Sequence, residues 1–222
     1  MNSDKIFYII VTVFTVAILF GIVFFSSKKI KQNSSKEDSK KIPLEELMGT
    51  SPHVKGNLDM AKVIVVEFGD FECPACKSAQ PIVNKIYEDF SKEVAIIYRH
   101  FPLISIHKYA FEAAVASEAA SLQGKFFEYH DLLYQRQRDN SNPLKKEDFI
   151  KIAKDLNLNE SQFKQDFESE STKSKVQEDL DYARSLGLRG TPTFFVNGMQ
   201  VNTVNLYNTV QNLVSDTKSE AN

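Results

Sequence analysis

Cysteine is nearly absent from this chain of 222 residues, which contains only Cys73 and Cys76. So few thiols exclude a small domain held together by a network of disulfides. An excess of basic side chains is also missing, since 27 Lys and Arg stand against 29 Asp and Glu, and this balance gives no support to nucleic-acid binding. With 42% apolar and 25% charged residues, the chain has the composition of a globular protein and not of a collagen-like or disordered one.

The longest apolar run lies at the N-terminus. No charged residue occurs between Lys5 and Lys28, and the stretch Ile6–Phe25 is long enough for a helix of about 20 residues that spans a bilayer. A cleaved signal peptide is the competing interpretation, but its apolar core usually has about 7 to 15 residues and ends at small residues. Apolar side chains on every face also argue against a helix of a soluble core. We therefore predict an uncleaved signal-anchor over residues 1–27.

The segment after the apolar run, residues 28–50, is rich in serine and lysine and predicts a flexible linker. Its lysines complicate the orientation of the anchor. Lys28, Lys29 and Lys31 follow the apolar run, whereas Lys5 precedes it, and cationic flanks tend to stay on the cytoplasmic side. Taken alone, this bias predicts that the globular part faces the cytoplasm.

The globular part, residues 51–222, combines strand and helix patterns. Runs of β-branched residues of strand length predict buried strands, and apolar residues at helical spacing predict helices. A long and purely helical stretch, from about residue 106 to 186, separates the second strand from the third. The expected elements are a strand at 62–68, a helix over the stretch 73–90, a strand at 94–100, the helical stretch, strands at 193–196 and 199–201, and a helix at 205–214.

The two cysteines belong to the motif Cys73-Pro74-Ala75-Cys76, at the junction of the first strand and the first helix. A disulfide that closes only two intervening residues removes little entropy from the unfolded chain, so a purely structural bridge is a weak interpretation. A structural zinc site needs four ligands. The histidines that would supply two of them show no suitable spacing; they are His53, His100, His107 and His130. Two buried inert thiols are the other alternative. The pattern favours a redox-active pair, with no metal and no cofactor.

The redox interpretation gives each thiol its own role. The free N–H groups and the positive dipole end at a helix N-terminus favour an anion, so Cys73 is the predicted attacking thiolate. Cys76, one turn further along, is placed to resolve the mixed disulfide. Glu67, on the preceding strand, is a candidate buried carboxyl that relays the proton of Cys76, and a carboxylate at a strand edge is the alternative. Asp70 and Glu72 are expected to oppose thiolate formation or only to solvate the loop.

Two motifs in this order make the chain recognisable: VVEFGDFECPACK, which contains the cysteines, and GTPTFFVNG, which begins at Gly190. Together they resemble the DsbA-like thiol-disulfide oxidoreductases, and the likeness extends over residues from about 55 to 215. The resemblance implies an α/β protein with a thioredoxin-like fold and an inserted helical domain at about 106–186. In this chain the fold is preceded by one predicted N-terminal transmembrane helix.

The resemblance also assigns roles to particular residues. It implies that Cys73 and Cys76 form a redox-active disulfide and that Glu67 is the buried acid of the family. Thr191 and Pro192 fall on the cis-proline loop, where the backbone of the residue before the proline pairs with the substrate peptide. The Pro-Ala interior of the motif lacks the histidine of the strongly oxidising archetype. Without that imidazolium we expect a less stabilised thiolate and a less oxidising disulfide.

The resulting hypothesis is a membrane-tethered, extracytoplasmic enzyme that introduces disulfides into exported proteins with free thiols. The resemblance implies reoxidation by a membrane partner of the quinone-linked thiol oxidase type. It also implies a position on the periplasmic or extracellular face of the cell membrane, outside the reducing cytosol, and this outweighs the lysine bias. Two alternatives stay open: a disulfide reductase or isomerase of the same fold, and a tethered chaperone module that holds exposed peptides around Pro192.

Overall fold

The computed structural model describes residues 41–219, with side chains up to residue 217. The predicted anchor and most of the predicted linker lie outside this range. Within it, no helix is both long and apolar enough to cross a bilayer. The predicted linker extends to residue 50, whereas the folded part begins earlier, with helix α2 (Leu44–Met48). The reason is burial: Leu47 is fully buried, and its carbonyl accepts a hydrogen bond of 2.9 Å from the side chain of Arg99.

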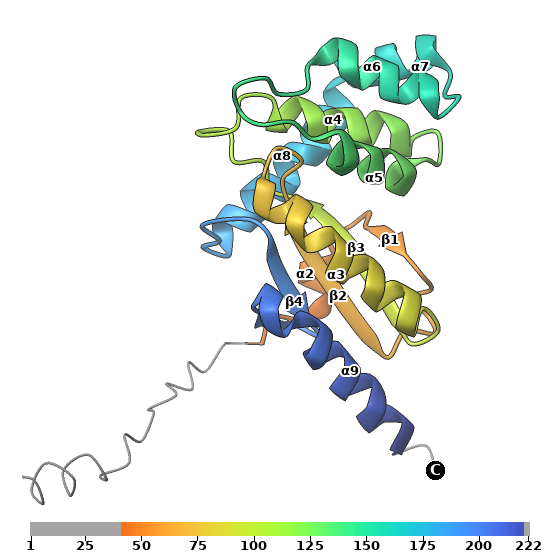
Figure 1. Ribbon diagram of the computed structural model, residues 1–222, viewed down its shortest axis with the longest axis vertical. Helices are drawn as coiled ribbons and strands as arrows, with labels where there is room; N and C mark the ends of the chain where they lie inside the picture. Colours follow the sequence, from red (N-terminus) through yellow and green to blue (C-terminus); the bar gives the residue numbers. More distant parts are fainter. Residues whose placement is uncertain (1–40, 220–222) are drawn as a thin grey trace, which may run out of the picture. The chain divides into compact units, whose positions relative to one another are not determined.

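Five strands form one mixed sheet in the order β1-β3-β2-β4-β5 (Figure 1). The central strands β2 and β3 run parallel, and β4 pairs antiparallel with β2. Because both faces of the sheet are covered, nearly every residue of the two central strands is buried. The strand β1 has no signal in the sequence, since three residues are too few for a periodic pattern. The strands are β1 (His53–Lys55), β2 (Val63–Gly69), β3 (Val94–His100), β4 (Thr193–Val196) and β5 (Met199–Val201).

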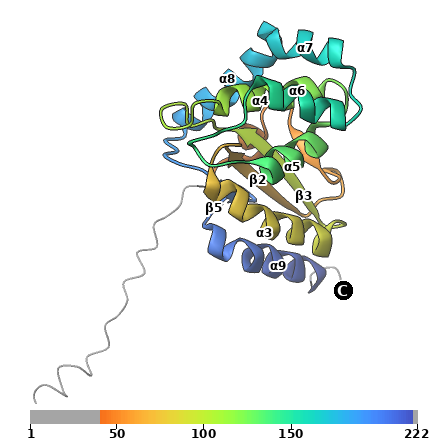
Figure 2. The same ribbon diagram turned by 45° about the horizontal axis from the view of Figure 1, so that its top comes forward.

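Successive residues of β2 point to opposite faces of the sheet, as the pleat requires. Val63 and Val65 pack in the cluster formed with α3 (Pro74–Phe90) and α9 (Thr203–Ser219). Figure 2 shows these two helices side by side against the sheet. Val66 and Phe68 pack in a second cluster with α2 and with helix α8 (Glu170–Ser185). The strand that leads to the thiols is therefore fixed from both sides.

The chain between β3 and β4 contains five helices. The first four lie beyond one end of the sheet in Figure 1, and the last one, α8, also packs against a face of the sheet. They surround a hydrophobic core of their own, which includes Tyr129, Phe149 and Phe163. The alanines of the first helix are buried because its neighbours pack closely against it. The same core also contains Cys76 and Tyr98, so it continues to the thiols. These helices are α4 (Ala110–Ser121), α5 (Phe126–Arg136), α6 (Lys146–Asp155), α7 (Glu160–Glu168) and α8 (Glu170–Ser185).

Candidate active site

The dithiol motif lies where the chain leaves β2 and enters α3. Cys73 is the N-cap of α3 and has an extended backbone, and Pro74 follows at the start of the helix, where a proline loses no backbone hydrogen bond. The Cys73 N–H donates to the carbonyl of Asp70 at 3.1 Å, which closes the turn. Cys73 is 6% exposed and Cys76 is completely buried, and both thiols are free. Only the Cys73 sulfur is thus placed for attack by another molecule.

The two thiols have opposite pKa shifts. A hydrogen bond from the Cys76 thiol, with further hydrogen bonds from the backbone N–H groups of Cys76 and Ala75, lowers the pKa of Cys73 to about 5, against the opposing effect of burial. Burial raises the pKa of Cys76 well above its usual value, and the charges of Glu67 and Cys73 raise it further. At neutral pH the reduced pair therefore holds one negative charge, on Cys73.

Alkylation of the reduced protein by iodoacetamide should report this thiolate directly. We expect the rate at Cys73 to rise with pH through a midpoint near 5 and to level off below neutrality, because only the thiolate reacts. The Cys73→Ser variant, which retains Cys76 alone, is the control and should react slowly throughout that range. A midpoint near the ordinary thiol value of about 8.5 would contradict the assignment.

The loop before β4 lies against the attacking thiol. The carbonyl oxygen of Thr191 is 3.3 Å from the Cys73 sulfur, and the Thr191–Pro192 peptide bond is cis. The side chain of Thr193 donates to the carbonyl of Gly190 at 2.8 Å and braces the start of the strand. The antiparallel pairing of β4 with β2 thus brings together the two sequence motifs, which are separated by 118 residues at this contact.

Glu67 lies on β2, in the interior of the sheet, and is 1% exposed. One carboxyl oxygen accepts a hydrogen bond of 3.1 Å from the Gln80 amide, and the other has no partner among the described residues. Burial raises the pKa of Glu67 to about 8, opposed by the hydrogen bond from Gln80. A carboxylate at a strand edge does not fit this environment, because β2 lies between β3 and β4. At neutral pH Glu67 is a buried, protonated carboxyl. When it ionises, its negative charge raises the pKa of Cys76.

Asp70 and Glu72 join the active-site turn to the loop before α4. Asp70 accepts hydrogen bonds from His107 Nδ1 at 2.7 Å and from the Leu103 N–H at 2.8 Å. Glu72 accepts one from the Tyr109 N–H at 2.6 Å. The expectation that these acids only solvate the loop is wrong, because both side chains are buried and bind the backbone of a distant segment. No local sequence pattern predicts such contacts.

Gln137, just after α5, is a site residue that the sequence does not indicate. Its side-chain amide donates to the carbonyl of Phe71 at 2.8 Å and to the carbonyl of Cys73 at 3.0 Å. The ammonium of Lys77 donates in the other direction, to the carbonyl of Gln137 at 3.0 Å. The helices between β3 and β4 therefore hold the backbone of the active-site turn directly.

A second polar cluster joins β1, β3 and α4. Although burial opposes it, hydrogen bonds from His100 and His53 hold the pKa of Glu118 well below its usual value. The Nε2 atoms of the two histidines lie 2.9 and 2.7 Å from one Glu118 oxygen. The structure thus brings together two histidines that show no related spacing in the sequence. This cluster offers three donor atoms among the described residues, one fewer than a structural zinc ion requires.

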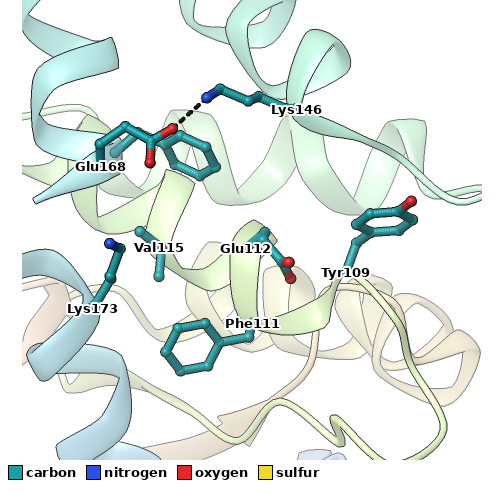
Figure 3. A pocket seen from close by; sticks show the side chains of 8 residues that line it. Tyr109, Phe111, Glu112, Val115, Lys146, Glu168 and Lys173 are labelled. Atoms are coloured by element: carbon teal, nitrogen blue, oxygen red, sulfur yellow. Dashed lines mark hydrogen bonds and ion pairs between the residues drawn. The ribbon is translucent and has the colours of Figure 1, made fainter. Parts of the chain in front are cut away.

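A pocket of about 260 Å³ lies among the helices that follow β3 (Figure 3). Its base is aromatic and aliphatic, and an ion pair between Lys146 and Glu168 crosses its rim. It is separate from the thiols, since neither cysteine lines it. The lining residues are Tyr109, Phe111, Glu112, Val115, Lys146, Phe167, Glu168 and Lys173.

A thioredoxin-like sheet with a CxxC motif at the start of helix α3, facing a cis-proline loop, defines a dithiol protein of the thioredoxin fold. The protein-family model described as Thioredoxin matches residues 49–216. The chain is 32% identical over 211 residues to the probable disulfide bond formation protein D of Bacillus cereus, covering 91% of this chain and 93% of that protein. It therefore belongs to the DsbA-like thiol-disulfide oxidoreductases, which confirms the resemblance seen in the two motifs.

Solved structures agree with this family. The crystal structure of oxidised BdbD from Bacillus subtilis is 27% identical to the chain and superposes with a TM-score of 0.64, covering 73% of this chain and 92% of that one. Other relatives share only a part of their length. The Na(+)/H(+) antiporter NhaA 1 of Salinispora arenicola is 42% identical over 146 residues, which is 66% of this chain and 22% of the antiporter. The chain thus spans less than a quarter of that relative.

Proposed function

We propose that this chain is a membrane-tethered, extracytoplasmic oxidase that introduces disulfides into exported proteins. The observation that carries the direction of the reaction is the lowered pKa of Cys73. A stabilised thiolate favours the reduced form of the enzyme, and a favoured reduced form makes the disulfide a stronger oxidant. The value of about 5 lies between those of thioredoxin, about 7, and DsbA, about 3.5. The thiolate is thus stabilised without the imidazolium that the Pro-Ala interior lacks.

The reaction begins with the disulfide between Cys73 and Cys76. A substrate thiolate attacks the Cys73 sulfur, the S–S bond breaks, and Cys76 leaves with the electron pair. Because the pKa of Cys76 is raised, this sulfur takes up a proton, and the protonated Glu67 is the nearby candidate donor.

A second substrate thiolate then attacks the substrate sulfur in the mixed disulfide. Cys73 leaves as a thiolate, which its low pKa favours, and two electrons have passed from the substrate to the enzyme. The Thr191 carbonyl lies beside the Cys73 sulfur, so we assign the backbone around Thr191 and Pro192 to pairing with the substrate peptide. Reoxidation of the dithiol is assigned to a membrane partner of the quinone-linked thiol oxidase type.

The tether and the compartment rest on the sequence. The apolar stretch over residues 6–25 has the length of a transmembrane helix, and disulfide formation needs an oxidising environment. A topology reporter fused after Asn222 tests the compartment. Export of the reporter is expected, and a reporter that stays in the cytoplasm would remove the oxidase role.

The reduction potential separates an oxidase from a reductase. After equilibration with glutathione, we expect a potential between the value of about −270 mV for thioredoxin and that of about −120 mV for DsbA, because the acidity of Cys73 is intermediate. The purified protein should also oxidise a reduced peptide that carries two thiols. A potential at the thioredoxin end of this range would favour the reductase or isomerase alternative.

A further inference from the structure

We propose that Gln137 is a positioning residue that holds the active-site turn in the geometry that stabilises the Cys73 thiolate. The inference rests on the proposed role of Cys73 as the attacking thiol. It assigns to the helical part of the protein a direct influence on the reactivity of the sulfur.

The contacts of Gln137 use the whole donor capacity of its amide. The Nε2 atom carries two hydrogens, and it lies 2.8 Å from the carbonyl oxygen of Phe71 and 3.0 Å from that of Cys73. These carbonyls flank Glu72, so one side chain fixes two peptide groups of the turn. In return, Lys77 of α3 donates to the carbonyl of Gln137 at 3.0 Å. The turn and the end of α5 are therefore joined in both directions.

The orientation of these peptide groups matters to the sulfur. The Cys76 thiol contributes most to the lowered pKa of Cys73, and the backbone N–H groups of Cys76 and Ala75 at the start of α3 lower it further. A carbonyl that rotates toward the sulfur would present the negative end of its dipole to the anion instead. Gln137 holds the carbonyl of Cys73 by a hydrogen bond of 3.0 Å, in addition to the helical hydrogen bond of 3.2 Å that this carbonyl accepts from the Lys77 N–H. The buried acids Asp70 and Glu72 do not replace it, because their side chains accept hydrogen bonds and cannot bind a carbonyl.

The test compares the Gln137→Glu and Gln137→Ala variants of the full chain with the wild type. Gln123→Glu is the matched control, because the Gln123 amide also binds backbone, donating to the Asn159 carbonyl at 3.3 Å and accepting from the Asn159 N–H at 2.8 Å. Three quantities are measured: the pH midpoint of Cys73 alkylation, the equilibrium constant with glutathione, and the melting temperatures of the oxidised and reduced forms.

We expect both Gln137 variants to raise the alkylation midpoint, and Gln137→Glu to raise it more because it adds an anion near the thiolate. The equilibrium constant with glutathione should shift about tenfold toward the disulfide form of the enzyme, because the loss of two neutral hydrogen bonds is enough for a change of this size. The melting temperature of the reduced form should decrease more than that of the oxidised form, because the oxidised form has no thiolate to stabilise. The Gln123 control should match the wild type in the first two measurements.

Folded Gln137 variants with an unchanged midpoint and an unchanged equilibrium constant would overturn the inference. An equal shift in Gln123→Glu would also overturn it, since a general loosening of the helices would then explain the effect. If Gln137→Glu does not melt cooperatively, Gln137→Ala decides by the same criteria. A wild-type midpoint near 8.5 would remove the proposed function together with this inference, whereas a wild-type midpoint near 5 with unaffected variants removes the inference alone.

Discussion

The Cys73→Ser variant should lose disulfide-forming activity by roughly three orders of magnitude or more, the scale seen when an enzyme loses its nucleophile. No other thiol can take over the reaction. Cys76 is the only other cysteine in the chain, it is fully buried, and its pKa is raised well above the usual value. The measurement is the rate at which the purified, oxidised protein converts a reduced two-thiol peptide into its disulfide.

The Cys76→Ala variant should fail in a different way. It keeps the Cys73 thiolate, which can attack a disulfide of an oxidised substrate and displace one of its sulfurs, but it has no second thiol to release the enzyme. Covalent complexes between Cys73 and such substrates should therefore accumulate and dissolve on addition of reductant. Ser78→Ala is the control, since Ser78 is an exposed residue in the next turn of α3 that donates to the carbonyl of Pro74 at 2.9 Å. Full function in Cys73→Ser would instead favour a chaperone module that holds peptides around Pro192.

The sequence motifs predict the centre of the site because local rules apply there. A β-branched run followed by CxxC places Cys73 at a helix N-terminus, and the chemistry of that position predicts a lowered pKa, as the structure shows. Burial of Glu67 follows from the apolar character of its strand. The thioredoxin-like fold comes from the two motifs and their order, and the family match confirms it.

The supporting contacts could not be predicted, because each depends on a long-range approach between side chain and backbone. Gln137 reaches the turn from 64 residues away, and His107 reaches Asp70 from 37 residues away. His53 and His100 meet at Glu118 only because β1 pairs with β3. Hydrophobic periodicity carries no information about such polar partners. The same reason explains why α2 is missed, since its burial depends on contacts with distant residues.

Glu67→Gln should make the protein more stable at neutral and alkaline pH. In the folded protein the Glu67 pKa is about 8, whereas in the unfolded chain it returns to about 4.5. Between these values the folded state holds a proton that the unfolded state has released, so the stability of the wild type falls as pH rises from about 4.5 to 8. Glutamine has the shape of the neutral carboxyl and does not titrate, so the variant should escape this loss.

The gain in stability at pH 7 should be roughly 3 kcal/mol, and it should disappear below pH 4, where Glu67 is protonated in both states. Urea unfolding of the oxidised protein at pH 4, 7 and 8 measures the difference without any contribution from a thiolate. Glu88→Gln, an exposed acid on α3, is the control and should not change this pH dependence. Equal stability of wild type and Glu67→Gln at pH 8 would show that Glu67 is not a buried neutral carboxyl.

The same variant should be slower in catalysis although it is more stable. If Glu67 gives its proton to Cys76 as the disulfide opens, Glu67→Gln should slow disulfide exchange at pH 7 by about tenfold or more, because glutamine cannot donate a proton in this way. The alkylation midpoint of Cys73 should stay near 5, since Glu67 is not among the groups that lower it. If Glu67→Gln is more stable than the wild type but exchanges disulfides at the same rate, Glu67 is a buried neutral carboxyl but not a proton relay. The pair of measurements therefore separates the cost of burying this carboxyl from its use in the reaction.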